Sequence, residues 1–191
     1  MGKEIELKYA ATAAQLEALK ARFPHLHSIA METTYYDTPQ GDFSRLKWTF
    51  RRRMENETSI CTLKTPMAGH GRAEFEVECS DILEAVPLLL EQGAPQELTD
   101  LVAKGIAPSC GAKFTRLAGL LEIPAGVAEL ALDEGILLGG GRELPFMEVE
   151  LELKEGSEEA LVAYAAPLAA EFGLRSEPRS KVARARKLAE T

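Results

Sequence analysis

Charged and apolar residues alternate along several stretches of this chain, most clearly over 148–152, where three glutamates are separated by single aliphatic residues. Successive side chains of a β-strand point to opposite faces, so this stretch predicts a strand with one acidic and one apolar face. The stretches 4–9 and 72–79 follow the same rule. Their charged positions, taken together, are Glu4, Glu6, Lys8, Arg72, Glu74, Glu76, Glu148, Glu150 and Glu152.

Weaker alternation and turn residues predict further strands, and apolar residues at helical spacing predict helices. We expect strands over 4–9, 31–37, 46–54, 58–64, 72–79, 113–122, 127–138 and 147–153. We expect helices over 12–23, 81–91, 98–104, 157–172 and 178–190. Strands in this order favour an α+β fold in one domain, 1–191: an antiparallel eight-stranded closed β-barrel, or tunnel, with helices packed outside.

The charged strand faces have two interpretations. They are either a solvated outer surface around an apolar core, or the lining of a wet interior. The helices over 81–91 and 157–172 need an apolar partner, which the apolar strand faces would supply on the outside of a barrel. Carboxylates also gather on the first, fifth and eighth strands and bases on the third, fourth and sixth. Both features favour the charged interior.

Composition narrows the function classes. The net charge is −8, which argues against a general nucleic-acid surface. Cys61, Cys79 and Cys110 lack the spacing of metal ligands and are odd in number, so we expect reduced cysteines in a cytoplasmic protein. No apolar stretch reaches the length of a membrane span or a signal peptide, so we expect no membrane contact.

Carboxylates massed beside bases suggest a particular ligand. Clustered carboxylates repel one another unless a divalent cation lies among them, and arginine and lysine side chains bind phosphate oxygens. The sequence therefore predicts a metal-bound phosphate chain. No glycine-rich phosphate loop is present, and residues 139–141 are better interpreted as a hairpin turn.

The ordered set of motifs resembles the CYTH domains, also called triphosphate tunnel metalloenzymes, along nearly the whole chain. The motifs are Glu4-Ile5-Glu6-Leu7-Lys8, Tyr35-Tyr36-Asp37-Thr38-Pro39, Arg51 with Arg53, Thr62 with Lys64, Arg72 with Glu74 and Glu76, Leu132-Asp133-Glu134-Gly135, Glu148 with Glu150 and Glu152, and Ser180-Lys181 with Arg184. The set is most similar to the bacterial inorganic triphosphatases. Some members of that family continue into a second, helical domain, and the sequence leaves open whether this chain is a stand-alone form.

The resemblance implies a set of site residues. Glu4, Glu6 and Lys8 would be catalytic. The metal, Mg²⁺ or Mn²⁺, would be held by Glu4, Glu6, Glu74, Glu76, Asp133, Glu148 and Glu150. The substrate would contact Lys8, Arg51, Arg53, Lys64, Arg72, Arg116, Lys181 and Arg184. The family pattern has a second base two places after Arg116, where this chain has Ala118. Lys181 would belong either to a helix that plugs the tunnel or to a surface helix with salt bridges.

The function implied is metal-dependent hydrolysis of inorganic triphosphate to pyrophosphate and phosphate, without a covalent nucleophile. The alternatives are a thiamine or nucleoside triphosphatase, a class IV adenylyl cyclase, or a polyphosphate- or nucleotide-binding module without turnover. The few aromatic residues, 6% of the chain, favour a small inorganic substrate. We expect a small polyanion as partner, no nucleic acid, and a monomer or homodimer.

Overall fold

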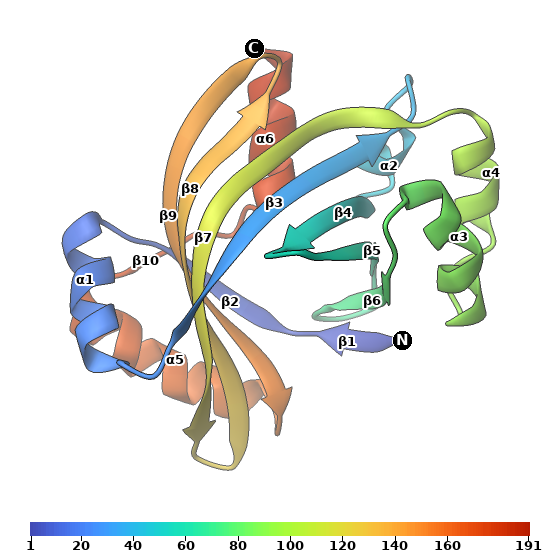
Figure 1. Cartoon of the computed structure of the whole chain (residues 1–191). Helices are drawn as coiled ribbons and strands as arrows, with labels where there is room; N and C mark the ends of the chain where they lie inside the picture. Colours follow the sequence, from blue (N-terminus) through green and yellow to red (C-terminus); the bar gives the residue numbers. More distant parts are fainter.

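A single antiparallel sheet organises the computed structural model, which describes residues 1–191 (Figure 1). Its ten strands are β1 (Gly2–Glu4), β2 (Glu6–Ala10), β3 (His27–Asp37), β4 (Thr49–Glu55), β5 (Thr58–Pro66), β6 (Arg72–Glu78), β7 (Ala107–Ile123), β8 (Gly126–Gly139), β9 (Arg142–Glu155) and β10 (Arg175–Ser176). The helices are α1 (Ala13–Arg22), α2 (Asp42–Arg45), α3 (Ile82–Glu91), α4 (Glu97–Ala103), α5 (Glu158–Phe172) and α6 (Lys181–Glu190). In space the strands follow the order β1-β6-β5-β4-β3-β7-β8-β9-β2-β10.

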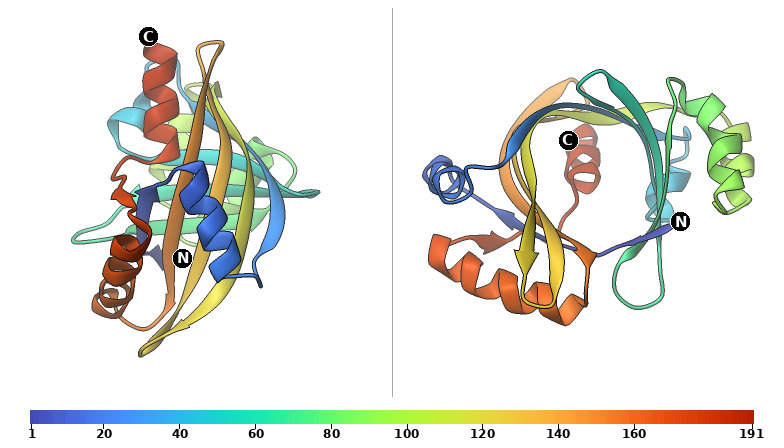
Figure 2. Two further views of the ribbon diagram at one scale, coloured as in Figure 1. Left: turned by 90° about the vertical axis from the view of Figure 1, so that its left-hand side faces the viewer. Right: turned by 60° about the horizontal axis from the view of Figure 1, so that its bottom comes forward.

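The segment that was expected as one N-terminal strand forms two strands, β1 and β2, which lie near opposite ends of this order. It is interrupted at Ile5, so that β1 pairs with β6 while β2 pairs with β9. The sheet therefore curls into a ring in projection (Figure 2). Gly71 makes the close approach to β1 possible, because a Cβ atom there would lie 2.7 Å from the carbonyl oxygen of Glu4.

The antiparallel α+β architecture of the prediction is confirmed, but its strand count is not. The interruption at Ile5 divides one expected strand into two, and Arg175–Ser176 adds a short strand beside β2. The result is a curled sheet of ten strands with β1 and β10 at its ends, so the closed eight-stranded barrel is not confirmed.

The apolar strand faces point outward and are covered by helices, as the second interpretation of the pattern requires. Helices α1 and α5 pack on β9 and its neighbours through Leu19, Leu161 and Leu151. Helices α3 and α4 cover β5 and β6 through a second core that includes Leu89 and Leu63. These leucines are at most 1% exposed, and each fully buried leucine contributes about 1.5–3 kcal/mol.

Helix boundaries follow local signals in the sequence. Thr12 forms a reciprocal capping box with Gln15 at the start of α1. Asp81 accepts hydrogen bonds from two backbone N–H groups at the start of α3, as its position predicts. Gly173 ends α5 in the left-handed conformation, with φ of 68°. None of the helices is both long enough and apolar enough to cross a membrane.

Helix α6 departs from the prediction that the helices pack outside. It lies inside the curled sheet, against β7, β8 and β9 (Figure 2). Gly139 allows this seat, because a Cβ atom there would lie 2.4 Å from the carbonyl oxygen of Ala185. Ser180 caps the helix by accepting a hydrogen bond from the Ala183 N–H. Of the two alternatives for Lys181, the helix inside the tunnel is the one observed, because the basic residues of α6 find their counter-charges on the inner faces of β8 and β9.

Candidate functional site

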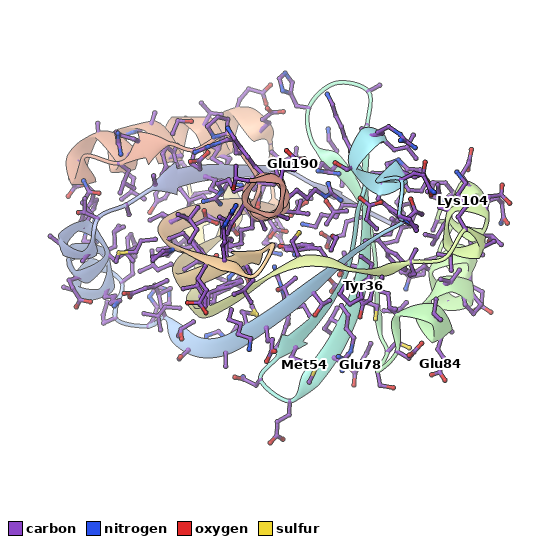
Figure 3. All side chains as sticks on the ribbon, turned by 90° about the horizontal axis from the view of Figure 1, so that it is seen from above. Tyr36, Met54, Glu78, Glu84, Lys104 and Glu190 are labelled. Carbon is purple, nitrogen blue, oxygen red and sulfur yellow. The ribbon has the colours of Figure 1, made fainter.

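The curled sheet encloses a cavity of about 240 Å³ whose lining is almost wholly charged. Only two of its twenty lining residues are hydrophobic. Eight carboxylates line it: Glu4, Glu6, Glu55, Glu74, Glu76, Glu129, Glu150 and Glu152. Eight cations line it: Lys8, Arg51, Arg53, Lys64, Arg72, Arg116, Lys154 and Lys181. Seen from above, α6 is viewed end-on beside this interior with Glu190 at its near end, whereas Glu84 and Lys104 mark helices at the outer edge (Figure 3).

The carboxylates form a row across three neighbouring strands. Glu6 of β2 lies opposite Glu152 of β9, and Glu152 in turn lies opposite Glu129 of β8. Like charges directly opposite one another destabilise a sheet, so this row needs a counter-charge. The sequence pattern identified the inward face of β9 correctly, but it could not give the register that places Glu152 opposite Glu6. Alternation determines the face of a side chain and not its cross-strand neighbour.

Glu6 has the most strongly shifted pKa of the carboxyl groups in this row. Burial, together with the nearby carboxylates of Glu150 and Glu4, raises the pKa of Glu6 to about 7. The side chain is still 31% exposed to the cavity, so water screens part of this effect. Lys8, 3.9 Å from Glu6, compensates only partly. Near neutral pH the Glu6 carboxyl is therefore divided between its protonated and ionised forms.

A second acidic group lies deeper. Oxygen atoms of Asp133, Glu148 and Glu150 approach within 4.8 Å of one another, a spacing suited to a cation. The Lys181 ammonium contacts all three, at 2.8 Å from Asp133 and 2.6 Å from Glu150. Its approach to Glu148 is an ion pair without hydrogen-bond geometry, because Glu148 Oε1 has no hydrogen-bond donor. The lysine ammonium thus occupies the position among these carboxylates that a cation would take.

Two arginines complete this deep cluster. Arg116 donates two hydrogen bonds to Asp133, each of 2.8 Å, and a third of 2.8 Å to Glu150. Arg184 of α6 donates to Glu148. Burial opposes ionisation of Glu150, but Lys181 and Arg116 outweigh it and hold its pKa well below the usual range. Three carboxylates and three cations are therefore balanced in this cluster.

The bases on β4 are less fully paired. Arg51 is half-buried, and its buried Nε atom has no hydrogen-bond acceptor. Burial disfavours its charge, but Tyr35 and Glu74 among others raise its pKa overall. Arg53 donates a 2.8 Å hydrogen bond to the Thr33 hydroxyl and forms no ion pair within 4.0 Å. Burial and the nearby charge of Arg51 lower the pKa of Arg53 to about 10. These guanidinium groups retain donor capacity for an anion.

On the neighbouring strands the bases are partly compensated. Lys64 contacts Glu4 and lies 3.1 Å from Glu74. Burial opposes ionisation of Glu74, but Lys64 and Arg51 outweigh it and lower its pKa. Burial raises the pKa of Glu76, which accepts a 3.3 Å hydrogen bond from Thr62. This side of the cavity thus alternates acids and bases.

Most of the predicted site residues meet at one cavity. Those that line it are Glu4, Glu6, Lys8, Arg51, Arg53, Lys64, Arg72, Glu74, Glu76, Arg116, Glu150 and Lys181. Asp133, Glu148 and Arg184 do not line it and lie in the deep cluster instead. The prediction omitted Glu55, Glu129, Glu152 and Lys154 as site residues. Alternation could have found all four of them. Glu55 continues the spacing of Arg51 and Arg53, Glu129 shares a face with Asp133, and Glu152 and Lys154 continue the spacing of Glu150.

Three solved structures are similar to this chain over nearly its full length. A protein of Hippeastrum, described as a putative adenylyl cyclase with a dominant triphosphatase activity, has a TM-score of 0.69 at 20% identity, covering 98% of this chain and 96% of the other. A putative adenylate cyclase of Bacillus halodurans gives 0.67 at 20% identity over 94% and 96%. The PH1819 protein of Pyrococcus horikoshii gives 0.66 at 21% identity over 98% and 99%. At these identities the likeness shows the fold alone.

Sequence comparison adds a relative and a family. An inorganic triphosphatase of Haemophilus influenzae is 28% identical over 193 residues, which cover 96% of this chain. The chain spans about half of that relative's length, 54%. The model of the CYTH domain family matches residues 2–185, which contain the whole charged cavity. The chain therefore belongs to the CYTH domain family.

Proposed function

We propose that this chain hydrolyses inorganic triphosphate to pyrophosphate and phosphate in the charged cavity, with a divalent metal ion. The observation that carries the proposal is the lining itself, in which eight cations and eight carboxylates face one cavity of about 240 Å³. Such a lining suits a compact polyanion accompanied by a cation. The inorganic triphosphatase of Haemophilus influenzae, at 28% identity, supports the same substrate class.

The bases would hold the phosphate chain. Arg51 and Arg53 offer planar guanidinium groups whose donors can pair with two phosphate oxygens at once. Neither has an ion-pair partner within 4.0 Å, and the Nε atom of Arg51 has no acceptor in the protein. Lys8, Lys64 and Arg116 would add positive charge from neighbouring strands. As the terminal phosphate departs, these cations would stabilise the charge that develops on pyrophosphate.

The carboxylate row fits a divalent metal ion. Glu6, Glu152 and Glu129 face one another across three strands, and Glu4 adds another carboxylate near Glu6. Burial is the largest cause of the raised pKa of Glu6, and the carboxylates of Glu150 and Glu4, which Lys64 and Lys8 only partly compensate, add to it. Mg²⁺ or Mn²⁺ prefers such oxygen donors, and when bound it supplies charge neutralisation and acidification of water. Glu4, Glu6 and Glu152 are the residues that would hold it.

The remaining lining residues argue against a covalent intermediate. Ser180 is engaged as the N-cap of α6, and no cysteine or histidine lines the cavity. Water would therefore be the nucleophile. The fully buried part of the deep cluster, Asp133 and Glu148, takes no direct part here, because Lys181 and Arg184 already compensate these carboxylates. Its role would be to fix Arg116 and Glu150 at the cavity wall.

A nucleotide substrate is the second candidate, favoured by the names of the Hippeastrum and Bacillus halodurans proteins. The cavity gives it little support. Tyr35 and Val182 are the hydrophobic residues of the lining, and Tyr35 is only 2% exposed. A nucleobase would therefore find no exposed aromatic surface on which to stack.

Phosphate release from triphosphate, ATP and thiamine triphosphate, measured in parallel with Mg²⁺, Mn²⁺ or a chelator, tests the proposal. We expect release from inorganic triphosphate to be fastest and to stop with chelator. Glu6→Gln should lower kcat/KM by at least about 100-fold, whereas the matched surface variant Glu17→Gln should not. Tight triphosphate binding without metal-dependent release would identify a binding module and overturn the enzymatic proposal.

A further inference from the structure

One aromatic side chain stands on the charged face of β7. Phe114 shares that inward face with Arg116 two residues later, and it is only 6% exposed. It belongs to a small interior core with Met31, Leu137 and Phe146. This core lies on the same side of the sheet as the cavity, whereas the two large cores lie under the outer helices.

Three cations lie over the Phe114 ring. The ring centroid is 5.0 Å from the Lys181 Nζ atom, 5.4 Å from the Arg53 Cζ atom and 5.7 Å from the Arg116 Cζ atom. The face of an aromatic ring carries negative electrostatic potential and attracts cations within about 6 Å. These three cations come from α6, β4 and β7, and they meet over a single ring.

The position of the ring is fixed by a cross-strand triplet. Gly135 of β8 lies opposite Phe114 on one side and Phe146 of β9 on the other. A Cβ atom at Gly135 would lie 2.2 Å from the Lys113 carbonyl oxygen and 2.5 Å from Phe114 Cβ. The two phenylalanine rings meet edge-to-face across this glycine, with centroids 5.6 Å apart. The glycine that ends the motif at 132–135 therefore makes room for the ring.

The ring matters most for Arg53. Lys181 and Arg116 have carboxylate partners, but Arg53 has no ion pair within 4.0 Å and only the Thr33 hydroxyl as hydrogen-bond acceptor. Its neighbour Arg51 adds repulsion. Glu150 attracts the Arg53 charge only from beyond 4.0 Å, so the Thr33 hydroxyl and the Phe114 ring face are the groups that hold the guanidinium at short range.

We propose that Phe114 is a positioning residue, whose ring face holds Arg53, and with it Arg116 and Lys181, in the arrangement that receives the phosphate chain. This inference rests on the proposed function only for the identity of the anion. The ring contacts no substrate itself. A carboxylate at this position would also attract the arginines, but it would repel the incoming anion, whereas the uncharged ring does not.

Fluorinated phenylalanines at position 114 test the inference, because fluorine weakens the ring's electrostatic attraction while nearly preserving its shape. One measurement is the order of the Arg53 Nε–Hε group by NMR relaxation in the protein without ligand. The other is the affinity for inorganic triphosphate by calorimetry in the presence of chelator. From one to three fluorines we expect a graded loss of Arg53 order and an affinity loss that reaches about tenfold.

Phe23 supplies the matched control. It is buried to the same degree, 7% exposed, and Arg22 lies over its ring, but it belongs to the outer core. Trifluorophenylalanine at position 23 should change neither measurement. Unchanged Arg53 order across the series at position 114 overturns the inference, as does a graded loss of order with full triphosphate affinity. A wild-type protein that releases no phosphate would refute the proposed function alone, because the Arg53 measurement needs no substrate.

Discussion

Replacing Lys181 by methionine tests how charge stabilises the interior. The change removes one positive charge and keeps most of the side-chain volume. In the wild-type protein three carboxylates face three cations in the deep cluster, and the Lys181 side chain is 6% exposed. In the variant one negative charge of Asp133, Glu148 and Glu150 has no counterpart. Both Asp133 and Glu148 are fully buried, so water cannot replace the ammonium without rearrangement.

The expected loss follows from that burial. Removing one partner of a buried ion pair costs about 3–5 kcal/mol, whereas an exposed pair contributes about 0–1 kcal/mol. Because folded domains are stable by about 5–15 kcal/mol, the variant should fold but with a large part of its stability lost. Urea denaturation followed by the fluorescence of Trp48, the single tryptophan, measures the difference. Lys187→Met changes an exposed lysine of the same helix and should alter stability by less than about 0.5 kcal/mol.

The pH dependence of the stability loss in Lys181→Met tests whether the unpaired buried charge causes it. The pKa of Glu150 is lowered in the wild-type fold, so its contribution to stability is present above its unfolded pKa and lost as the pH falls through the folded pKa. Lys181→Met removes much of that lowering, so the difference between variant and wild type should narrow as the pH falls. Mn²⁺ should partly restore the variant's stability by occupying the vacated position. A loss below about 1 kcal/mol at pH 7.5, or a loss independent of pH, would refute the reasoning from buried charge.

Three further changes give distinct expectations. Gly139→Ala places a Cβ atom 2.4 Å from the Ala185 carbonyl oxygen and should lower the free energy of unfolding by about 1–3 kcal/mol in the same urea assay. The control Gly2→Ala, whose Cβ atom would have no atom within 4 Å, should leave the stability almost unchanged. Equal losses in the two variants would contradict the position of α6 against Gly139. Glu6 has a folded pKa of about 7, above its unfolded value, so its stabilising effect is complete below the unfolded pKa and lost as the pH rises through 7. Glu6→Gln should remove about 1 kcal/mol of this pH dependence, reduced for solvent screening, between pH 5 and 8 in denaturation curves; identical slopes in both proteins would exclude the raised pKa. Arg51→Lys keeps the positive charge but loses the Nε donor, which has no acceptor in the protein. Calorimetry should therefore show about tenfold weaker triphosphate binding, while the stability of the fold stays nearly unchanged. An unchanged affinity would show that Arg51 does not contact the anion.

The local sequence pattern determined which side chains share a strand face and where several helices end. Alternation along 148–152 and 72–79 identified which side chains share a face, because that depends only on the two-residue repeat of a strand. Sorting of acids and bases among the strands then predicted a charged interior, which the cavity confirms. Helix ends at Asp81 and Gly173 were likewise predictable, since a cap depends on residues a few positions away.

The register and the interior helix required the tertiary structure. Glu152 lies opposite Glu6 because of a register that depends on pairing between strands far apart in the sequence. The N-terminal strand is divided at Ile5 because its two parts pair with different neighbours, β1 with β6 and β2 with β9. The sequence left open whether Lys181 belongs to a helix that plugs the tunnel or to a surface helix. The position of α6 inside the sheet, where Lys181 contacts three carboxylates, decides between them. Sequence alone determined which charges face inward, whereas the long-range contacts decided which charges meet, because electrostatic pairing depends on distance in space.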